Sequence, residues 1–416
     1  MTATPLPAQR HLTLDVLRGV AVMGILAMNV VAFALPEAAY LNPMAAGVES
    51  DADLVAWAFN FILVDGKMRG LFSFLFGASM LLVIDKAAAG GASPASVHFR
   101  RMFWLLLFGY LHFYFIWYGD ILTGYASIGM LAWFFRGLEP RRLIFWGAIF
   151  VLLQFVLFAA MAAAFLTIGQ AAAAPNADAD TLRQWAEMQQ GLAVPAAAQA
   201  ARETALYLGS WGDLVRHQLV DETFEPLEML FIFGWETLAY MLLGMAALKS
   251  GFLTGSWLDA DYRKIAGIGF AIAIPVYALL AVLLWADGFS VVMIVALALA
   301  ATVPLRPLMV VAIAALVILL SRRGGATVER VAASGRAAFT NYLGTSIVMT
   351  ALFYGWGLGL FGSMSRAELW IVVIAMWALM LAWSKPWLDR FLYGPFEWLW
   401  RSLARWRGQP MRRTPA

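Results

Sequence analysis

The sequence contains no cysteine among its 416 residues, which excludes disulfides, thiol nucleophiles and cysteine-ligated metals. Charged side chains are also scarce, at 13% of the chain, whereas hydrophobic residues make up 62%. The mean hydropathy of +0.75 is typical of a chain whose solvent is mostly lipid, so we predict an integral membrane protein. The net charge of +3 then reflects basic cytoplasmic loops and gives no reason to expect a nucleic-acid partner.

Long apolar runs separated by short polar segments predict an all-α, polytopic membrane helix bundle of about ten transmembrane spans. The first run, residues 12–35, is long enough to span a membrane. No small-residue cleavage site follows this run, so we do not expect a cleaved signal peptide. Most of the 29 Lys and Arg residues fall in loops on one side of these spans. The positive-inside rule places that side, and with it both termini, in the cytoplasm.

Residues 1–416 are predicted to form a single integral membrane domain with two additions. Residues 170–226 are the longest polar segment and are expected as an extracytoplasmic loop insert. Residues 386–416 read as a basic, amphipathic cytoplasmic tail that lies at the inner membrane surface. Two apolar stretches are interrupted, at residues 65–70 and 304–307. Either the first interruption is a break inside the membrane that faces an internal polar site, or it is an ordinary bend at the interface.

Histidine is scarce as well, because the chain has only four. His112 is predicted to lie in the middle of a span, whereas His11, His98 and His217 are predicted in polar flanks or loops. An ionisable side chain at that depth is costly and is therefore a functional-site hypothesis. Asp120 follows in the same hairpin, and a carboxylate there orients an imidazole base in the way that hydrolytic triads do. The competing interpretation makes His112 a packed, hydrogen-bonded residue and Asp120 only the cap of the next helix.

Other polar side chains are predicted at membrane depth or at its cytoplasmic mouth. They are Asp15, Arg18, Asn29, Lys67, Arg69, Arg100, Arg101, Glu236 and Asn341. Asp15, Arg18 and Asn29 share one face of the first span, because residues three apart are neighbours on a helix. Each of the nine has a structural alternative: an ion pair that anchors a helix end, an interhelical hydrogen bond, or a topology anchor.

Four stretches, in this order, resemble a known family. They are L-D-V-L-R-G-V-A with the asparagine of residues 14–29, D-G-K-M-R-G-L-F-S-F-L-F-G of residues 65–77, His112 with G-D-I-L of residues 119–122, and G-R-A-A-F-T-N-Y of residues 335–342 with G-P-F-E-W of residues 394–398. On these motifs the chain is identified as a member of the YeiB family of bacterial inner-membrane proteins. That resemblance implies a multi-pass protein of the bacterial cytoplasmic (inner) membrane.

The opening L-D-x-L-R-G-x-A is also similar to that of transmembrane acyltransferases, which include polysaccharide O-acyltransferases and heparan-alpha-glucosaminide N-acetyltransferase. This second resemblance implies a bundle of about ten spans, acyl-CoA as the donor and no tightly bound cofactor. It also implies an envelope glycan or lipid-linked acceptor on the far side of the membrane. The chain departs from the pattern at one position. Asn29 matches an asparagine of the heparan enzyme, but Tyr40 stands eleven residues later, where that enzyme has its histidine.

If acyl transfer occurs, His112 must therefore replace the missing histidine as the base, with Asp120 orienting it. Asn29 or Asn341 would donate a hydrogen bond to the oxyanion. The phosphates of the donor would meet three arginines at the cytoplasmic mouth of the bundle. These are Arg18, Arg100 and Arg101.

Two other functions stay open. One is a transporter or channel for a small polar or anionic solute, with Lys67, Arg69, His112, Asp120 and Glu236 along a polar path. The two halves of the chain show no convincing similarity to one another, which disfavours a transporter built from repeats. The other is a structural or assembly partner without turnover. No metal site is expected, and the oligomeric state is left open.

Overall fold

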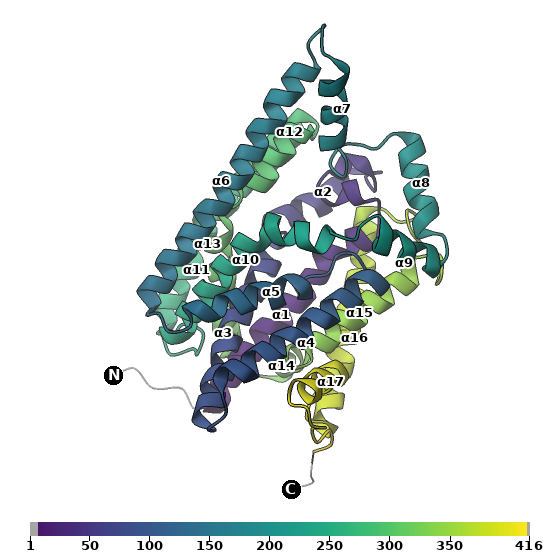
Figure 1. Ribbon diagram of the computed structural model, residues 1–416. Coiled ribbons are helices and arrows are strands. Elements are labelled where there is room, and N and C mark those ends of the chain that lie inside the picture. Colours follow the sequence, from purple (N-terminus) through teal and green to yellow (C-terminus); the bar gives the residue numbers. More distant parts are fainter. Residues whose placement is uncertain (1–6, 414–416) are drawn as a thin grey trace.

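The chain folds into a bundle of helices, as seen in a computed structural model that describes residues 7–413, with side chains from Leu12 onward (Figure 1). Within this range the only extended pairing is an isolated bridge between Phe391 and Arg412. The predicted all-helical class is therefore confirmed. The first helix, α1, begins and the last helix, α17, ends at the same end of the molecule, the lower one in Figure 1.

Six helical stretches are long and apolar enough to cross a membrane, and a bent pair supplies a seventh. The bent pair joins Val291–Ala301 to α13 (Arg306–Ser321) at an angle of 53°. The six are α1 (Pro7–Ala34), α2 (Asp51–Phe59) continued by α3 (Lys67–Ala89), α6 (Pro140–Ala172), α10 (Glu225–Lys249), α11 (Asp259–Asp287) and α16 (Arg366–Arg390). The chain is thus a multi-pass membrane protein with six or seven candidate spans.

The predicted number was about ten, and the difference lies in three helices of the core. α4 (Pro94–Phe115) carries His98, Arg100 and Arg101 near its start, which lowers its hydropathy. The other two, α5 continued by η4 (Leu122–Phe135) and α15 (Ala338–Phe353), are apolar but shorter than 18 residues.

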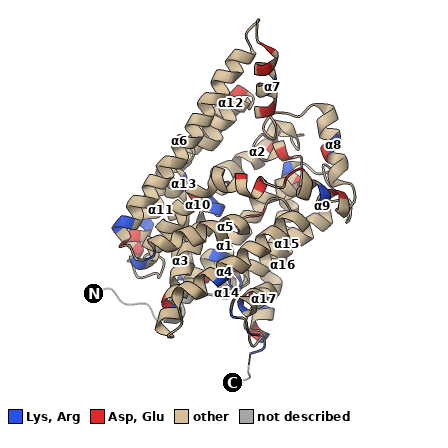
Figure 2. Ribbon diagram, in the orientation of Figure 1, with Lys and Arg blue, Asp and Glu red and all other residues tan. Residues whose placement is uncertain are grey.

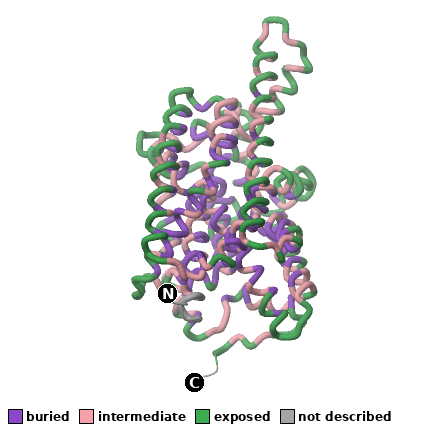
Figure 3. The backbone as a smooth tube through the Cα atoms, turned by 90° about the vertical axis from the view of Figure 1, so that its left-hand side faces the viewer, coloured by how far each residue is buried: buried purple, intermediate pink, exposed green. Residues whose placement is uncertain are grey.

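Of the remaining elements, those at residues 60–64 and 291–301 lie inside the two interrupted spans, and the others connect the spans or follow the last one. The predicted insert at residues 170–226 begins inside α6 and contains three amphipathic helices, and Figure 3 shows its projecting tip as exposed. The elements are η1 (Glu37–Tyr40), η2 (Pro43–Ala45), the π-helical η3 (Asn60–Val64), α7 (Ala179–Met188), α8 (Ala197–Tyr207), α9 (Trp211–Val220), α12 (Val291–Met293), the π-helical η5 (Ile294–Ala301), α14 (Ala326–Arg336) and α17 (Pro395–Ala404).

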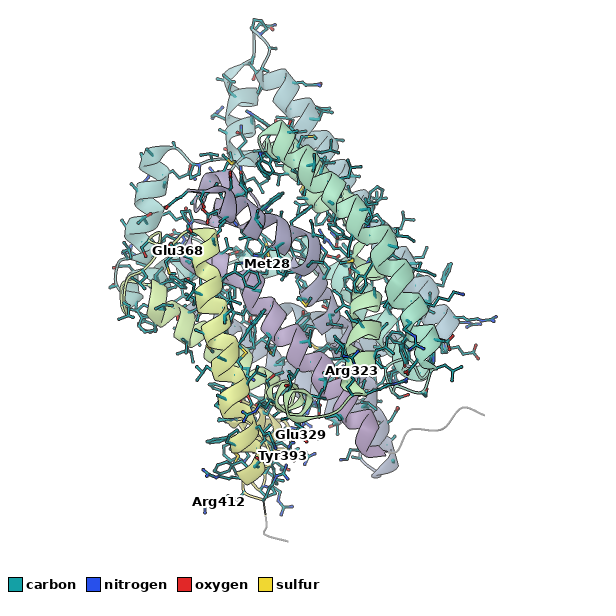
Figure 4. The ribbon with its side chains drawn as sticks, turned by 180° about the vertical axis from the view of Figure 1, so that it is seen from behind. Met28, Arg323, Glu329, Glu368, Tyr393 and Arg412 are labelled. Carbon is teal, nitrogen blue, oxygen red and sulfur yellow. The ribbon has the colours of Figure 1, made fainter. Side chains whose placement is uncertain are left out.

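Charge is divided between these ends. In Figure 2, Lys and Arg gather at the lower end, where α1 starts and α17 lies, and acidic residues gather around α2, α7 and α9 at the other end. From behind, Figure 4 shows Arg412 near the lower end, Arg323 and Glu329 above it, and Glu368 at the upper start of α16. This is the asymmetry that the positive-inside rule describes.

Two helix pairs in the core touch backbone to backbone. A Cβ on Gly244 of α10 would lie 1.7 Å from the carbonyl oxygen of Phe74 in α3, and one on Gly77 would lie 2.1 Å from that of Met241. Gly335 of α14 approaches α1 equally closely. Small residues allow such crossings in membranes, where dispersion contacts rather than hydrophobic burial hold helices together. The α3–α10 contact brings the interrupted span beside the helix that carries Glu236.

The tail is docked onto the start of α15. Glu397 of α17 accepts hydrogen bonds from the backbone N–H groups of Phe339 (2.6 Å) and Thr340 (3.0 Å), which the first turn of a helix leaves unpaired. Trp400 donates to the backbone oxygen of Arg101 (3.0 Å), and the Arg101 guanidinium lies 4.1 Å from the centre of the Trp400 ring. The tail therefore ties α4 to α15, two helices that form the candidate site.

We expect Glu397→Ala to lower the free energy of unfolding by about 1–3 kcal/mol, because it leaves buried backbone donors without a partner. Thermal unfolding of the detergent-purified protein, followed by tryptophan fluorescence, measures the loss. Glu329→Ala is the matched control, since that side chain is 58% exposed and makes only a 3.5 Å ion pair with Lys385. Equal melting temperatures for the two variants would contradict the docking role of Glu397.

Candidate functional site

The predicted His112–Asp120 pair is formed. Nδ1 of His112 lies 2.9 Å from Oδ1 of Asp120, and both side chains are 1% exposed. The second carboxylate oxygen, Oδ2, accepts a hydrogen bond from the backbone N–H of Thr123 (2.7 Å). Asp120 therefore both orients the imidazole and caps the helix after it, which begins at Leu122. The two interpretations of Asp120 describe one arrangement.

The turn between α4 and α5 produces this pairing. The backbone N–H groups of Ile116 and Trp117 both bond to the carbonyl oxygen of His112, at 2.9 and 2.8 Å, which ends α4 just beyond the histidine. The chain then reverses through Gly119 and returns Asp120 to the side of His112. Because the carboxylate accepts the Nδ1 proton, Nε2 carries the lone pair in the neutral ring. Nε2 is buried and has no hydrogen-bond partner within the described residues.

Two aromatic side chains line the imidazole. The Tyr342 ring centre lies 5.3 Å from that of His112, and the Tyr342 hydroxyl accepts a hydrogen bond from the Ile121 N–H (3.2 Å). The edge-on Trp117 ring lies 6.2 Å from His112 and stacks on Phe33 of α1 at 3.8 Å. Nε1 of Trp117, like Nε2 of His112, is buried without a partner. Unsatisfied buried polar atoms are rare in native structures, and two in contacting rings suit a site that a ligand completes.

Gly109 permits the close approach of α5 to α4. A Cβ there would lie 2.4 Å from Oγ1 and 2.5 Å from the backbone nitrogen of Thr123. We expect Gly109→Ala to displace Asp120 and Thr123 from His112 and to destabilise the protein by about 1–3 kcal/mol through overpacking. Gly124→Ala is the control, because nothing lies within 4 Å of its added Cβ, and it should be neutral or stabilising. Equal thermal unfolding of both variants would contradict this packing.

A second cluster lies where the two interrupted spans meet α10. Glu236, whose side chain is 3% exposed, accepts hydrogen bonds from Arg306 at 2.9 and 3.1 Å and from Arg69 at 3.1 Å. The hydroxyl of Tyr240 donates to the same carboxylate at 3.2 Å. Lys67 is 1% exposed, and its Nζ lies 2.5 Å from the carbonyl oxygen of Phe61. Glu236 thus pairs with Arg69 and Arg306, whereas Lys67 makes no ion pair within residues 12–413.

The cations of this cluster satisfy backbone that the interruptions leave unpaired. Arg306 donates through Nη2 to the carbonyl oxygen of Ala298 (3.2 Å), in the π-helical η5, and to the hydroxyl of Thr302 (2.7 Å). Gly66 has φ +69°, and a Cβ there would lie 2.9 Å from Nε of Arg306. Only glycine therefore fits at this position, where the two interrupted spans cross. Both interruptions are thus packed inside the protein, as the discontinuous-span interpretation requires.

The two asparagines predicted as oxyanion donors differ in how far their side chains are committed to other partners. Asn29 is half-buried and makes no side-chain hydrogen bond within the described part of the chain. The amide of Asn341 is committed to three partners, the carbonyl oxygen of Ser334 (2.9 Å), the hydroxyl of Ser384 (3.3 Å) and the indole N–H of Trp383 (2.9 Å). Asn341 therefore links α14, α15 and α16 and has no donor free for an oxyanion.

The basic residues predicted at the cytoplasmic mouth lie at the basic end of the bundle. Arg18 pairs with Asp15 at 2.7 Å and donates to the hydroxyl of Ser79 at 2.8 Å, which ties α1 to α3. Arg100 bonds to the carbonyl oxygen of its own helix at Ser96 (3.1 Å), and Arg101 lies against the tail. Asp15 and Arg18 are neighbours on one helix face, as their spacing indicates.

The prediction for His98 was wrong. His98 lies in α4, is 2% exposed, stacks on Trp133 at 5.2 Å and contacts the Gly129 carbonyl oxygen through Nε2 at 3.1 Å. Nearby arginines lowered the local hydropathy and hid the start of this helix. Sequence reasoning also left Arg306 out of the candidate set, although two prolines around it marked an interrupted span. Trp117 was not singled out, because the chain has 18 tryptophans, and Tyr342 was noted only as part of a family motif.

These features define a class: a polytopic helical membrane protein with a buried histidine–carboxylate pair and a buried ionic cluster. The chain belongs to the YeiB family. It is 31% identical over 407 residues to "Uncharacterized protein YeiB" of Escherichia coli (strain K12), covering 95% of this chain and 96% of that protein. It is 32% identical over 419 residues to "Uncharacterized protein YxaH" of Bacillus subtilis (strain 168), covering 96% and 95% of the two chains.

A family model described as "Protein of unknown function (DUF418)" matches residues 247–407. A Bacillus acidopullulyticus protein, "Uncharacterized 39.9 kDa protein in amylase 3'region", is 34% identical over 140 residues, which cover 34% of this chain and 38% of that protein. No solved structure matches. The predicted family membership is confirmed, and none of these names states an activity.

Proposed function

We propose that the protein is a membrane-bound acyltransferase that moves an acyl group, such as acetyl, from acyl-CoA to an envelope glycan or lipid-linked acceptor. The observation that carries the proposal is the His112–Asp120 pair, in which Asp120 holds Nδ1 while Nε2 stays buried and unpartnered. A base oriented by a second group is the arrangement that activates acceptors in acyl transfer. The similarity of the L-D-V-L-R-G-V-A opening to transmembrane acyltransferases supports the same reaction class.

The proposed reaction needs one proton carrier. Nε2 of His112 removes the proton from the acceptor hydroxyl or amine while the oxygen or nitrogen of that group attacks the thioester carbonyl. The carbon–sulfur bond then breaks, and the imidazolium returns its proton to the leaving thiolate, which yields the acylated acceptor and free CoA. Asp120 stabilises the imidazolium without itself becoming protonated. The oxyanion needs a hydrogen-bond donor. The amide of Asn341 is committed elsewhere, so the Nε1–H of Trp117, buried beside the His112 ring, takes this role.

The proposal includes an orientation in the bacterial cytoplasmic membrane. The basic end, with Arg18, Arg100 and Arg101, faces the cytoplasm together with both termini, and it meets the phosphates of acyl-CoA as a diffusible donor. The segment 170–226 and the acidic end lie outside. α4, α5 and α15 then also cross the membrane, which gives ten crossings, and α17 covers the start of the short α15.

Release of CoA by the protein in lipid nanodiscs tests this function. Because the chain has no cysteine, a thiol reagent reports only free CoA, with no background from the protein itself. We expect hydrolysis or transfer from millimolar acetyl-CoA in the wild type, and faster release when membrane glycolipid extract is added as acceptor. A rate equal to that of empty nanodiscs, with and without acceptor, would contradict the proposal.

The alternative function, a transporter or channel for a small polar or anionic solute, has its own supporting observation. Two discontinuous spans cross at Gly66 and Arg306, beside three cations and a buried glutamate, which resembles the broken helices of secondary transporters. Flux of solutes into proteoliposomes that depends on Arg69, with no release of CoA, would favour this second function over the first.

A further inference from the structure

Three arginines gather where the tail docks on α4, at the basic end of the molecule (Figure 2). Arg101 lies near the start of α4, Arg401 lies in α17 and Arg405 directly follows α17. The charged groups that act most strongly on Arg101 are Arg401 and Arg405. The Arg101 guanidinium lies against the Trp400 ring, and that of Arg401 lies 4.6 Å from the centre of the ring of Tyr393, near the lower end in Figure 4. We call these three residues the arginine cluster.

No carboxylate forms an ion pair with the arginine cluster within residues 12–413. Nε of Arg401 is a buried donor that has no hydrogen-bond partner in this range. The one acidic residue of α17, Glu397, accepts its hydrogen bonds from Phe339 and Thr340 instead. Burial lowers the pKa of Arg401, and the charge of Arg405 acts in the same direction, although Glu397 acts against them. Like charges held together with an unused donor indicate a site that an anion completes.

The arginine cluster borders an exposed apolar stripe on α4. Three large apolar side chains follow one another there at helical spacing and are exposed, namely Phe103, Leu107 and Leu111. Trp104 lies between this stripe and Arg101 on the helix surface, because the two residues are three positions apart. The Trp104 ring meets the exposed Trp406 of the tail edge-on, with ring centres 5.6 Å apart. Tryptophan beside basic and apolar surface is typical of a membrane interface.

We propose that the arginine cluster binds the phosphate of an anionic phospholipid of the inner leaflet, with the acyl chains along the exposed stripe of α4. Guanidinium groups hold phosphate oxygens through paired hydrogen bonds, and these would use the free Nε–H of Arg401. Basic residues gathered on an amphipathic helix at a membrane surface are typical of such headgroup sites. A soluble phosphate ester would meet the same guanidinium groups but leave the apolar stripe uncovered.

This site rests on the placement of the basic end at the cytoplasmic surface and does not depend on acyl transfer. The donor path proposed above also uses Arg101, but it uses neither Arg401 nor Arg405. Binding of lipid can therefore be measured through these two residues, without any readout of CoA release.

Native mass spectrometry of the full chain in neutral detergent tests the site with phosphatidylglycerol and with zwitterionic phosphatidylcholine of the same acyl chains. We expect the first phosphatidylglycerol to bind about ten-fold more tightly than the first phosphatidylcholine. Inorganic phosphate or coenzyme A, at about the same concentration as the lipid, should not displace it, because neither covers the apolar stripe. Equal affinity for the two lipids would overturn the proposal. Displacement by either soluble phosphate would also overturn it, in favour of a site for a soluble phosphate ester.

Two variants locate the phosphate. Arg401→Gln and Arg405→Gln should each weaken phosphatidylglycerol binding about five-fold, the effect of one basic residue at an anionic surface, and leave phosphatidylcholine binding unchanged. Arg405 is exposed, so its variant keeps the test open if loss of Arg401 disturbs the tail. Arg141→Gln is the matched control, because it removes the same charge from an exposed arginine in the first turn of α6. Wild-type lipid preference in both cluster variants, or an equal loss in the control, would overturn the assignment.

Discussion

The His112→Ala variant is expected to release CoA from acetyl-CoA about 10²–10⁴-fold more slowly than the wild type, the range by which a positioned general base accelerates a reaction. The residue is the only base beside Trp117 and Tyr342 whose lone pair is unpartnered, within the part of the chain that the structure describes. Initial rates at saturating acetyl-CoA, measured by thiol release in nanodiscs, give the comparison. The Michaelis constant should change little, because Nε2 acts on the acceptor proton and not on the donor phosphates.

His217→Ala is the matched control for this experiment. His217 also pairs with a carboxylate, through Nδ1 and Asp221 at 2.8 Å, but its side chain is 29% exposed and lies in α9 of the outer insert. Its removal should leave the rate unchanged. If His112→Ala instead unfolds while His112→Asn folds and keeps full activity, His112 is a packing residue, as the competing interpretation of the sequence holds.

Arg306→Ala is expected to produce the largest loss of stability, about 3–5 kcal/mol, because breaking one partner of a buried ion pair leaves an uncompensated charge. Glu236 would keep the Tyr240 hydroxyl and only one cation, Arg69. The carbonyl oxygen of Ala298 and the hydroxyl of Thr302 would each lose a donor. Thermal unfolding and the yield of monodisperse protein in detergent measure the effect. The double variant Arg306→Met/Glu236→Met should recover part of the loss, since it removes both charges together.

The exposed pair of Arg183 and Asp180 is the control for Arg306. Their side chains are 75% and 82% exposed, and Arg183→Ala should change stability by no more than about 1 kcal/mol. A melting temperature for Arg306→Ala equal to that of Arg183→Ala would mean that the crossing of the interrupted spans does not depend on this ion pair.

The sequence predicted the helical class, the family and the first pair of the site for physical reasons. Long apolar runs have few folding options in lipid, and a lone histidine in such a run needs a partner that a short hairpin supplies, here Asp120. The interruption at residues 65–70 was recognisable because Gly and charged side chains do not belong in an ordinary span.

Other features depended on three-dimensional packing. Asn29 and Asn341 were assigned from residue type and from a resemblance, but the neighbours that commit Asn341 to α14 and α16 come from distant parts of the chain. His98 was misplaced because Arg100 and Arg101 mask a helix start that Ser93 and Pro94 mark. Trp117 could be assigned to the site only from the structure, because its buried N–H has no partner within the described residues. The number of crossings stays a proposal, because α5 and α15 are apolar but too short to be identified as membrane spans by length.

A double-mutant cycle on CoA release tests the central claim most directly, because the claim is that His112 and Asp120 act as one unit. Asp120→Asn keeps the shape of the side chain but removes the charge that holds Nδ1. The account predicts that Asp120→Asn is slow, and that combining it with His112→Ala costs no further rate beyond His112→Ala alone. If the losses of rate in the two single variants multiply in the double variant, or if either single variant keeps full activity, the claim is contradicted.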